Sequence, residues 1–147
     1  MPQEYLRAVL QEDQKVNQLF TFLGARVAAA EDGAACVLLP VSSKLAQGGG
    51  MVAGGILATL ADEAMAHAVL SLLPKGQHTA TAEMNIRFLR ASDPKANGEI
   101  RAEGRVVKPG RSLMFAEAEI SDQTGRLLAT AGATFWVGGH PALEKKI

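Results

Sequence analysis

The sequence predicts an α+β domain in which a curled antiparallel sheet packs around one long helix. The first observation is the stretch 48–73, GGGMVAGGILATLADEAMAHAVLSLL, which opens with glycines and then has no helix breaker before Pro74. The second is a series of later segments in which apolar and charged residues alternate, as along strands with one buried face. A helix that is apolar almost all round must be buried, and the apolar face of such a sheet can bury it.

Composition indicates one ordinary globular domain spanning residues 1–147. Lys plus Arg and Asp plus Glu number 15 each, so bulk charge gives no attraction to nucleic acid or to an anionic membrane. The single Cys36 excludes an internal disulfide framework and indicates a reducing compartment, for which we expect the cytoplasm. We expect no secretory signal in the mixed-charge first fifteen residues, and the ionisable residues inside 51–73 argue against a membrane span.

The N-terminal third is expected to hold a helix followed by a hairpin. Residues 1–23 are assigned to an N-terminal helix because apolar positions between 3 and 20 fall roughly on one face, and Gly24 stands where helices end. Asp32-Gly33 lies between the β-like runs 25–31 and 34–41, which is a strong hairpin signal. Pro40 marks an edge or an exit of the second strand, and 42–53 is a loop.

Four further strands are expected after the central helix, at about residues 79–90, 98–108, 112–122 and 126–137. They are separated by Asp-Pro, Pro-Gly and Gln-Thr-Gly, each with turn chemistry. Short joints favour antiparallel neighbours. The polar residues 139–147 are assigned to a tail.

Three ionisable residues interrupt the apolar helix: Asp62, Glu63 and His67. A buried carboxylate needs a partner or a function, which makes Asp62 the first candidate for chemistry. Glu63 and His67 are spaced i, i+4, either as a second acid–base pair or as a satisfied pair at a subunit interface. No metal is expected, because the single cysteine and the three scattered histidines show no ligand spacing.

Three segments carry a resemblance to a known family: AGGILATLADEA at 53–64, AEMNIRFLR at 82–90 and VVKPGRSLMFAEAEISDQTGRLLATA at 106–131. They resemble the phenylacetate-pathway (PaaI-like) type of acyl-CoA thioesterase. The first is close to that family's HGG-x6-D signature, except that Ala53 stands where members usually carry His. The resemblance covers about residues 20–138. It implies the hotdog fold, an antiparallel sheet of about five to six strands curled around a central helix.

This resemblance implies hydrolysis of acyl-CoA thioesters, with a medium-chain or aryl acyl group, to the free acid and CoA. Asp62 would act as general base or as nucleophile, and both roles stay open. The N–H of Gly54, supported by Gly55, would bind the oxyanion at the start of the helix, where N–H groups lack partners; alternatively the glycines only permit close packing. Gln47 would orient the carbonyl or the water, and Thr81 would position the water; alternatively, Gln47 only bonds the backbone of its loop and Thr81 is an ordinary strand residue.

Coenzyme A carries three phosphates, so cations are expected at the mouth of the pocket. Since CoA is part of the substrate, no separate cofactor is expected. The alternative interpretation of the basic residues named next is ordinary solvated surface charge. The expected substrate-binding residues are Asn85, Arg87, Arg90, Lys108, Gly110, Arg111 and Ser112.

Helix geometry raises the question of oligomeric state. Eight helical residues separate Gly54 from Asp62 by roughly 12 Å, which is too far for both to act on one carbonyl carbon. In hotdog dimers the glycine and the acid commonly come from opposite subunits, so the resemblance implies a homodimer with composite sites, and a dimer of such dimers. No nucleic-acid or membrane partner is expected. The missing histidine at Ala53 keeps open a non-catalytic acyl-CoA binder or sensor.

Overall fold

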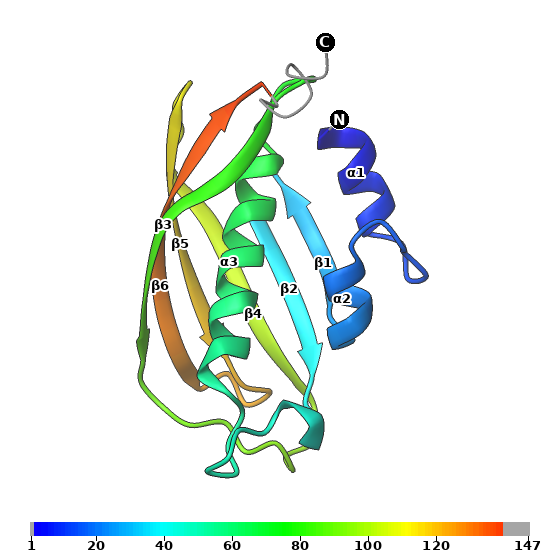
Figure 1. Ribbon diagram of the computed structural model, residues 1–147, viewed down its shortest axis with the longest axis vertical. Coiled ribbons are helices and arrows are strands. Elements are labelled where there is room, and N and C mark those ends of the chain that lie inside the picture. Colours follow the sequence, from blue (N-terminus) through cyan, green and yellow to red (C-terminus); the bar gives the residue numbers. More distant parts are fainter. Residues whose placement is uncertain (1, 140–147) are drawn as a thin grey trace.

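The structure, a computed structural model, describes residues 2–139, and Figure 1 shows one helix lying across the concave face of a single curled sheet. The strand order is β1-β2-β4-β5-β6-β3, and all five neighbouring pairs are antiparallel. This is the predicted α+β hotdog architecture, with six strands. In chain order the elements are α1 (Pro2–Val9), α2 (Gln18–Leu23), β1 (Arg26–Glu31), β2 (Ala34–Pro40), the 3-10 helix η1 (Ser43–Leu45), α3 (Gly54–Leu70), β3 (His78–Phe88), β4 (Glu99–Lys108), β5 (Leu113–Ser121) and β6 (Leu127–Gly138).

Helix α3 lies very close to the sheet because β4 carries a glycine beneath it. A Cβ placed on Gly104 would lie 2.5 Å from the backbone carbonyl of Ala64 and 2.7 Å from the nitrogen of Met65. Only glycine therefore lets the helix backbone approach this strand. The core closes around the contact with mostly small and branched side chains from both layers, including Leu57, Leu60, Ala61, Ile100, Ala102, Ala116, Ala118, Ile120 and Phe135.

The β1–β2 hairpin forms as predicted. Asp32 and Gly33 have φ values of 50° and 79°, the left-handed pair that a tight hairpin turn requires. The carbonyl of Gly33 also accepts a hydrogen bond from the backbone of Val106, at 2.7 Å. Pro40 is the last residue of β2 and sits beside β4, so it marks the exit of the strand.

The prediction of one N-terminal helix is wrong. Helix α1 ends at Val9 and α2 begins only at Gln18. Between them, the side chain of Gln14 accepts a hydrogen bond from the backbone of Asn17 at 2.9 Å, and Asn17 in turn accepts one from the N–H of Phe20 at 3.2 Å. These side chains satisfy the backbone locally and start a new helix at Asn17, in competition with a continuous one.

The six strands match their predicted positions within about two residues at each end, whereas α3 ends at Leu70, three residues before the predicted end at 73, and η1 lies within the predicted loop 42–53. Gly24 ends α2 in the left-handed conformation, with φ 77°. Strand β3 ends at Phe88, so Arg90 lies beyond it rather than on it. Within the described part of the chain, no helix is long and apolar enough to cross a membrane. Of the predicted tail, residues 140–147 lie outside the described residues.

Candidate active site

The carboxylate of Asp62 meets the hydroxyl of Thr81. Asp62 lies half-buried on α3, and the Thr81 Oγ1 donates a hydrogen bond to its Oδ1 at 2.6 Å. A charge-assisted O–H···O⁻ bond of this length is among the stronger polar contacts in proteins. Both residues come from the sequence prediction, and the fold brings them together across 19 positions of the chain.

A bulge in β3 sets which residues face the helix. Thr81 pairs with the buried Phe135 of β6, but the register shifts before Glu83, which pairs with Thr134 on the outer face. The Thr134 hydroxyl donates to the Glu83 carboxylate there, at 3.0 Å. Since one extra residue reverses the alternation, the odd-numbered side chains Glu83, Asn85 and Arg87 point away from the face that Thr81 occupies, and Met84, Ile86 and Phe88 point toward it.

The N-terminus of α3 presents two unused donors. Neither the N–H of Gly54 nor that of Gly55 donates to a backbone carbonyl among residues 2–139, and Ala53 caps the helix without a side-chain hydrogen bond. Gly55 is exposed, and a Cβ there would meet nothing within 4 Å. These N–H groups, together with the helix dipole, favour a negative charge.

Phe88 is a neighbour of this helix start that the sequence interpretation missed. A Cβ on Gly54 would lie 3.2 Å from the tip of the Phe88 ring, so Gly54 makes room for this ring. The ring remains 51% exposed although it is large and apolar. No periodicity in the sequence distinguishes Phe88 from an ordinary core residue at the end of a strand.

Gln47 is turned toward its own loop. Its side-chain oxygen accepts a hydrogen bond from the N–H of Gly49, and its backbone N–H donates to the carbonyl of Met51 at 2.8 Å. The same loop leads into the helix through Ala53, whose N–H donates to Leu45 at 2.9 Å. Gln47 therefore stabilises the loop before α3, and its amide does not reach Asp62 within this chain.

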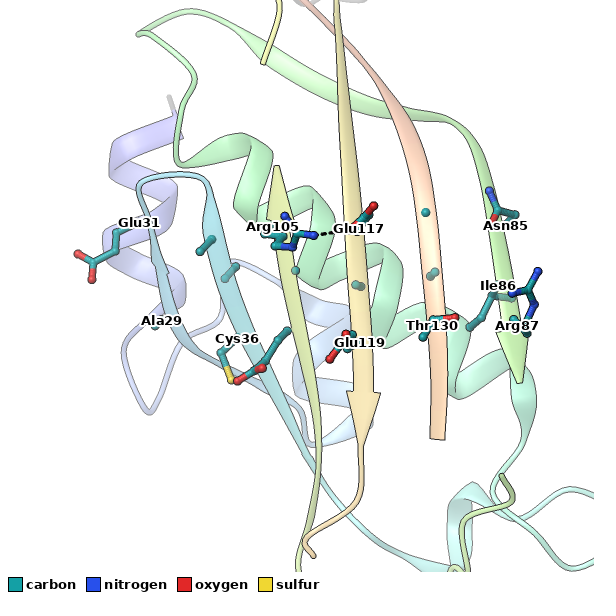
Figure 2. Close-up of a pocket in the computed structure, with 17 residues that line it drawn as sticks. Ala29, Glu31, Cys36, Asn85, Ile86, Arg87, Arg105, Glu117, Glu119 and Thr130 are labelled. Atoms are coloured by element: carbon teal, nitrogen blue, oxygen red, sulfur yellow. Dashed lines mark hydrogen bonds and ion pairs between the residues drawn. The ribbon is translucent and has the colours of Figure 1, made fainter. Parts of the chain in front are cut away.

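Asn85 and Arg87 face away from α3. They pair with Gly132 and Thr130 on β6 and line a groove of about 890 Å³ on the outer face of the sheet. Figure 2 shows their side chains on this face, with α3 behind the sheet. Within one chain both side chains therefore lie on the face opposite Asp62, because the β3 bulge reverses their orientation, and their role in binding substrate stays a prediction.

The other expected CoA contacts lie at opposite ends of the sheet. The Arg90 guanidinium donates to the carbonyl of Leu127 at 2.9 Å, at the end of β3 near the start of α3. Residues 108–112 form the β4–β5 turn, whose neighbour Leu113 pairs with Trp136 close to the beginning of β3. A Cβ on Gly110 would collide with the carbonyl of Leu113, so the tight turn itself requires glycine at this position. One chain alone does not bring the two ends together.

The described residues contain no group of three His, Cys, Asp or Glu arranged to hold a metal ion. His67 is 1% exposed, and its ring bonds to Tyr5 at 2.9 Å and to the carbonyl of Glu63 at 2.7 Å. Of the two interpretations of Glu63 and His67, these contacts favour the satisfied structural pair. Its partner is the N-terminal segment of the same chain.

Comparison with known proteins decides the family. The model of the thioesterase superfamily matches residues 49–129, which include Gly54, Asp62 and Thr81. A putative esterase from Halobacterium salinarum is 36% identical over 118 residues, covering 77% of this chain and 76% of the relative. The chain belongs to the thioesterase superfamily.

Two further relatives of this thioesterase-superfamily protein have names that state an activity or a pathway. A 1,4-dihydroxy-2-naphthoyl-CoA hydrolase from Listeria monocytogenes is 27% identical over 115 residues, covering 78% of this chain and 91% of the relative. The solved structure of the PaaI protein from the phenylacetic acid degradation operon of E. coli has a TM-score of 0.75 and 25% identity, covering 84% of this chain and 87% of that one. Both are similar over most of the domain.

Proposed function

We propose that this protein hydrolyses acyl-CoA thioesters with a medium-chain or aryl acyl group, as a PaaI-like member of its superfamily. The observation that carries the proposal is the 2.6 Å hydrogen bond from Thr81 of β3 to Asp62 of α3, a helix whose N-terminus has two N–H donors without a partner among the described residues. A positioned carboxylate and preorganised donors are what thioester hydrolysis needs. The CoA hydrolase from Listeria supports the substrate class.

The roles follow from the chemistry of each group. Asp62 either takes a proton from water as the water attacks the thioester carbon, or attacks that carbon itself. The developing oxyanion is held by the N–H of Gly54, with Gly55 in support. The tetrahedral intermediate then collapses, the carbon–sulfur bond breaks, and the CoA thiolate leaves and takes up the proton that the attacking water gave to Asp62. If Asp62 attacks the carbon itself, the thiolate takes its proton from solvent water, and the mixed anhydride left on Asp62 is hydrolysed by water to the free acid and the restored carboxylate. Thr81 holds the carboxylate in place, and in the proposal it also positions the water.

The two halves of this machinery come from different chains in the proposal. Strand β3 is at the edge of the sheet and runs antiparallel to α3, with Thr81 beside Asp62 and Phe88 beside Gly54. If β3 pairs with its copy about a two-fold axis, the Phe88 end of one strand lies opposite the Thr81 end of the other. Gly54 of one protomer is thereby brought toward Asp62 of the partner subunit.

The CoA contacts, the assembly of dimers and the cellular location are also part of this proposal. Lys108, Arg111 and Ser112 stay candidates for the CoA phosphates, since the turn that carries them is solvent-facing and the two basic side chains have no ion-pair partner among the described residues. Assembly into a dimer of dimers rests on the resemblance alone. The cytoplasmic location rests on Cys36, which is a free cysteine.

A non-catalytic acyl-CoA binder or sensor is the second candidate. Two observations favour it: Ala53 replaces the usual histidine, and the Gln47 amide is bound within its own loop. Ala53 leaves no imidazole beside a bound thioester, and the Gln47 amide is occupied by its own loop. The N–H groups at the start of α3 are still present and could still bind the acyl group.

Free-thiol release from a panel of acetyl-, hexanoyl-, decanoyl-, benzoyl- and phenylacetyl-CoA separates the two candidates. We expect turnover of the medium-chain or aryl members and its loss in Asp62→Asn, while the exposed-carboxylate control Asp13→Asn retains it. Calorimetric binding without thiol release from any member would establish the binder instead. Equal turnover by Asp62→Asn and wild type would remove Asp62 from the mechanism.

A further inference from the structure

A polar cluster joins the N-terminal segment to α3 on the side away from Thr81. We call residues 2–23 the N-terminal arm. The arm contributes Tyr5 from α1 and Asn17 from the start of α2, and α3 contributes Glu63 and His67. The ring of Phe20 stacks on His67 with centroids 5.5 Å apart, so the arm covers the cluster with apolar surface as well. Figure 1 shows both arm helices next to β1, on the opposite side of α3 from β3.

The carbonyl of Glu63 determines which atom donates in each hydrogen bond of this cluster. The carbonyl of Glu63 can only accept, so the His67 Nδ1 at 2.7 Å carries the proton in the neutral ring. The His67 Nε2 is then an acceptor, and the Tyr5 hydroxyl donates to it at 2.9 Å. The Asn17 side-chain nitrogen donates to the Tyr5 oxygen at 3.0 Å. The arm is thus docked on a neutral histidine with every polar group satisfied.

Glu63 is the member of the cluster whose charge is not balanced. Its side chain is 22% exposed, and the described Lys and Arg residues make no ion pair with it. The nearest candidate cation is the His67 Nδ1, 3.7 Å from its carboxylate, but burial lowers the pKa of His67 and keeps the ring neutral. Burial first, and then the charge of neighbouring Asp62, raise the pKa of Glu63 to about 7, against the lowering effect of the Asn17 amide.

We propose that Glu63 is an ionisable lock for the N-terminal arm: the arm docks against the neutral carboxyl and loosens when the carboxyl ionises. The arm reaches the Glu63 carboxyl through the Asn17 amide, and Tyr5 and Phe20 contact the ring of His67, whose Nδ1 lies 3.7 Å from that carboxyl. Releasing the arm returns the carboxylate to water, so ionisation favours release. This device is independent of the proposed catalysis.

The sign of the pH effect follows from the two titrating groups. The pKa of Glu63 is raised from 4.5 to about 7 in the docked state, so docking weakens as pH rises between those values and changes little above them. The pKa of His67 is lowered from 6.5, so docking also weakens as pH falls below that value. Burial raises the pKa of Tyr5 further above neutrality, and it stays protonated throughout.

Hydrogen–deuterium exchange of the arm amides in the full-length protein tests the lock. Wild type and Glu63→Gln are compared at the same pH, so that intrinsic exchange rates and the His67 effect cancel in their ratio. From pH 6 to 8.5 we expect arm opening in wild type, relative to Glu63→Gln, to rise by up to about tenfold, the value reached if arm release removes the whole shift from 4.5 to about 7. The strand amides of β4 and β5 should show no such change.

Two further variants separate the lock from general loosening. Glu12→Gln removes an exposed carboxylate from the same arm and should behave as wild type. Tyr5→Phe removes the hydroxyl that His67 accepts from, so it should loosen the arm at every pH while the dependence on Glu63 remains. The proposal would be overturned if the ratio of arm opening in wild type to arm opening in Glu63→Gln stayed constant from pH 6 to 8.5. It would also be overturned if Glu12→Gln removed the pH dependence of arm opening as fully as Glu63→Gln does.

Discussion

Asp62 and Glu63 are adjacent carboxylates on one helix, and the fold gives them opposite surroundings. Successive helical residues are about 100° apart around the axis, so Asp62 faces the edge strand β3 while Glu63 faces the N-terminal arm. Asp62 accepts a hydrogen bond from the Thr81 hydroxyl, whereas Glu63 lies beside the Asn17 amide and forms no ion pair with a Lys or Arg of the described residues. The same side-chain chemistry therefore supports two different proposals, catalysis for Asp62 and a pH-dependent contact with the arm for Glu63.

The largest expected effect is the loss of turnover when the proposed oxyanion donor is removed. Gly54→Pro deletes the N–H proposed for the oxyanion, at a helix position where proline is tolerated and after an Ala53 whose ψ of 135° suits a following proline. We expect kcat to fall about 100- to 1000-fold, as on loss of an oxyanion donor. Steady-state kinetics with circular dichroism as the folding control measures this. Retained turnover would exclude the Gly54 N–H from the site.

Glu63→Gln should act on stability rather than on chemistry. Because ionisation of Glu63 is disfavoured in the folded state, its contribution to the free energy of unfolding falls as pH rises from 4.5 to about 7. Between pH 5 and 8 we expect the variant to gain about 2 to 3 kcal/mol over wild type. Urea unfolding at a series of pH values checks this, and kcat should change little. A pH-independent difference would contradict it.

Gly104→Ala perturbs the packing of β4 against α3, the helix that carries both carboxylates. Its Cβ would meet the backbone of α3 at Ala64, 2.5 Å away, where nothing flexible can yield. We expect the free energy of unfolding to fall by about 1 to 3 kcal/mol, as for overpacking in other cores. Thermal unfolding measures the loss. Gly125→Ala, at a turn position with open space but a φ of 84°, gives a comparison for backbone strain without the helix clash.

Thr81→Val should give the smallest effect. The substitution keeps the shape of the side chain and removes the donor to Asp62. A hydrogen bond to a charged group contributes about 1.5 to 3 kcal/mol, and since water can replace part of it at this exposed strand, we expect kcat to fall about tenfold with KM little changed. Thr79→Val, on the same strand but bonded to the carbonyl of Trp136 at 2.8 Å, is the matched control. Equal losses in both would show a general effect on β3.

Much of the fold was predictable because its signals are local. The Asp32-Gly33 turn, the alternation along the last four strands and the unbroken apolar helix each depend on neighbouring residues. The pairing of Asp62 with Thr81 also agrees with the motif resemblance. The break between α1 and α2 was not predictable from periodicity, because Gln14 and Asn17 are compatible with a helix and interrupt it through side-chain bonds to the backbone.

The orientation of the candidate site depended on a single inserted residue. Strict alternation would place Asn85 and Arg87 on the same face as Thr81, and the bulge before Glu83 sends them outward. The arm cluster depends on contacts between residues 62 positions apart, Tyr5 and His67, which no local pattern reveals. Such features follow from tertiary packing, and sequence spacing alone does not encode them visibly.

Subunit complementation tests the central claim, that Gly54 and Asp62 act together across two chains. Asp62→Asn and Gly54→Pro are each expected to be nearly inactive, and the two are unfolded together, refolded and assayed for thiol release. With composite sites, each mixed dimer contains one intact site, so random mixing should restore about a quarter of wild-type activity per protomer. If both groups acted within one chain, every site would carry one defect, and the mixture would show no recovery.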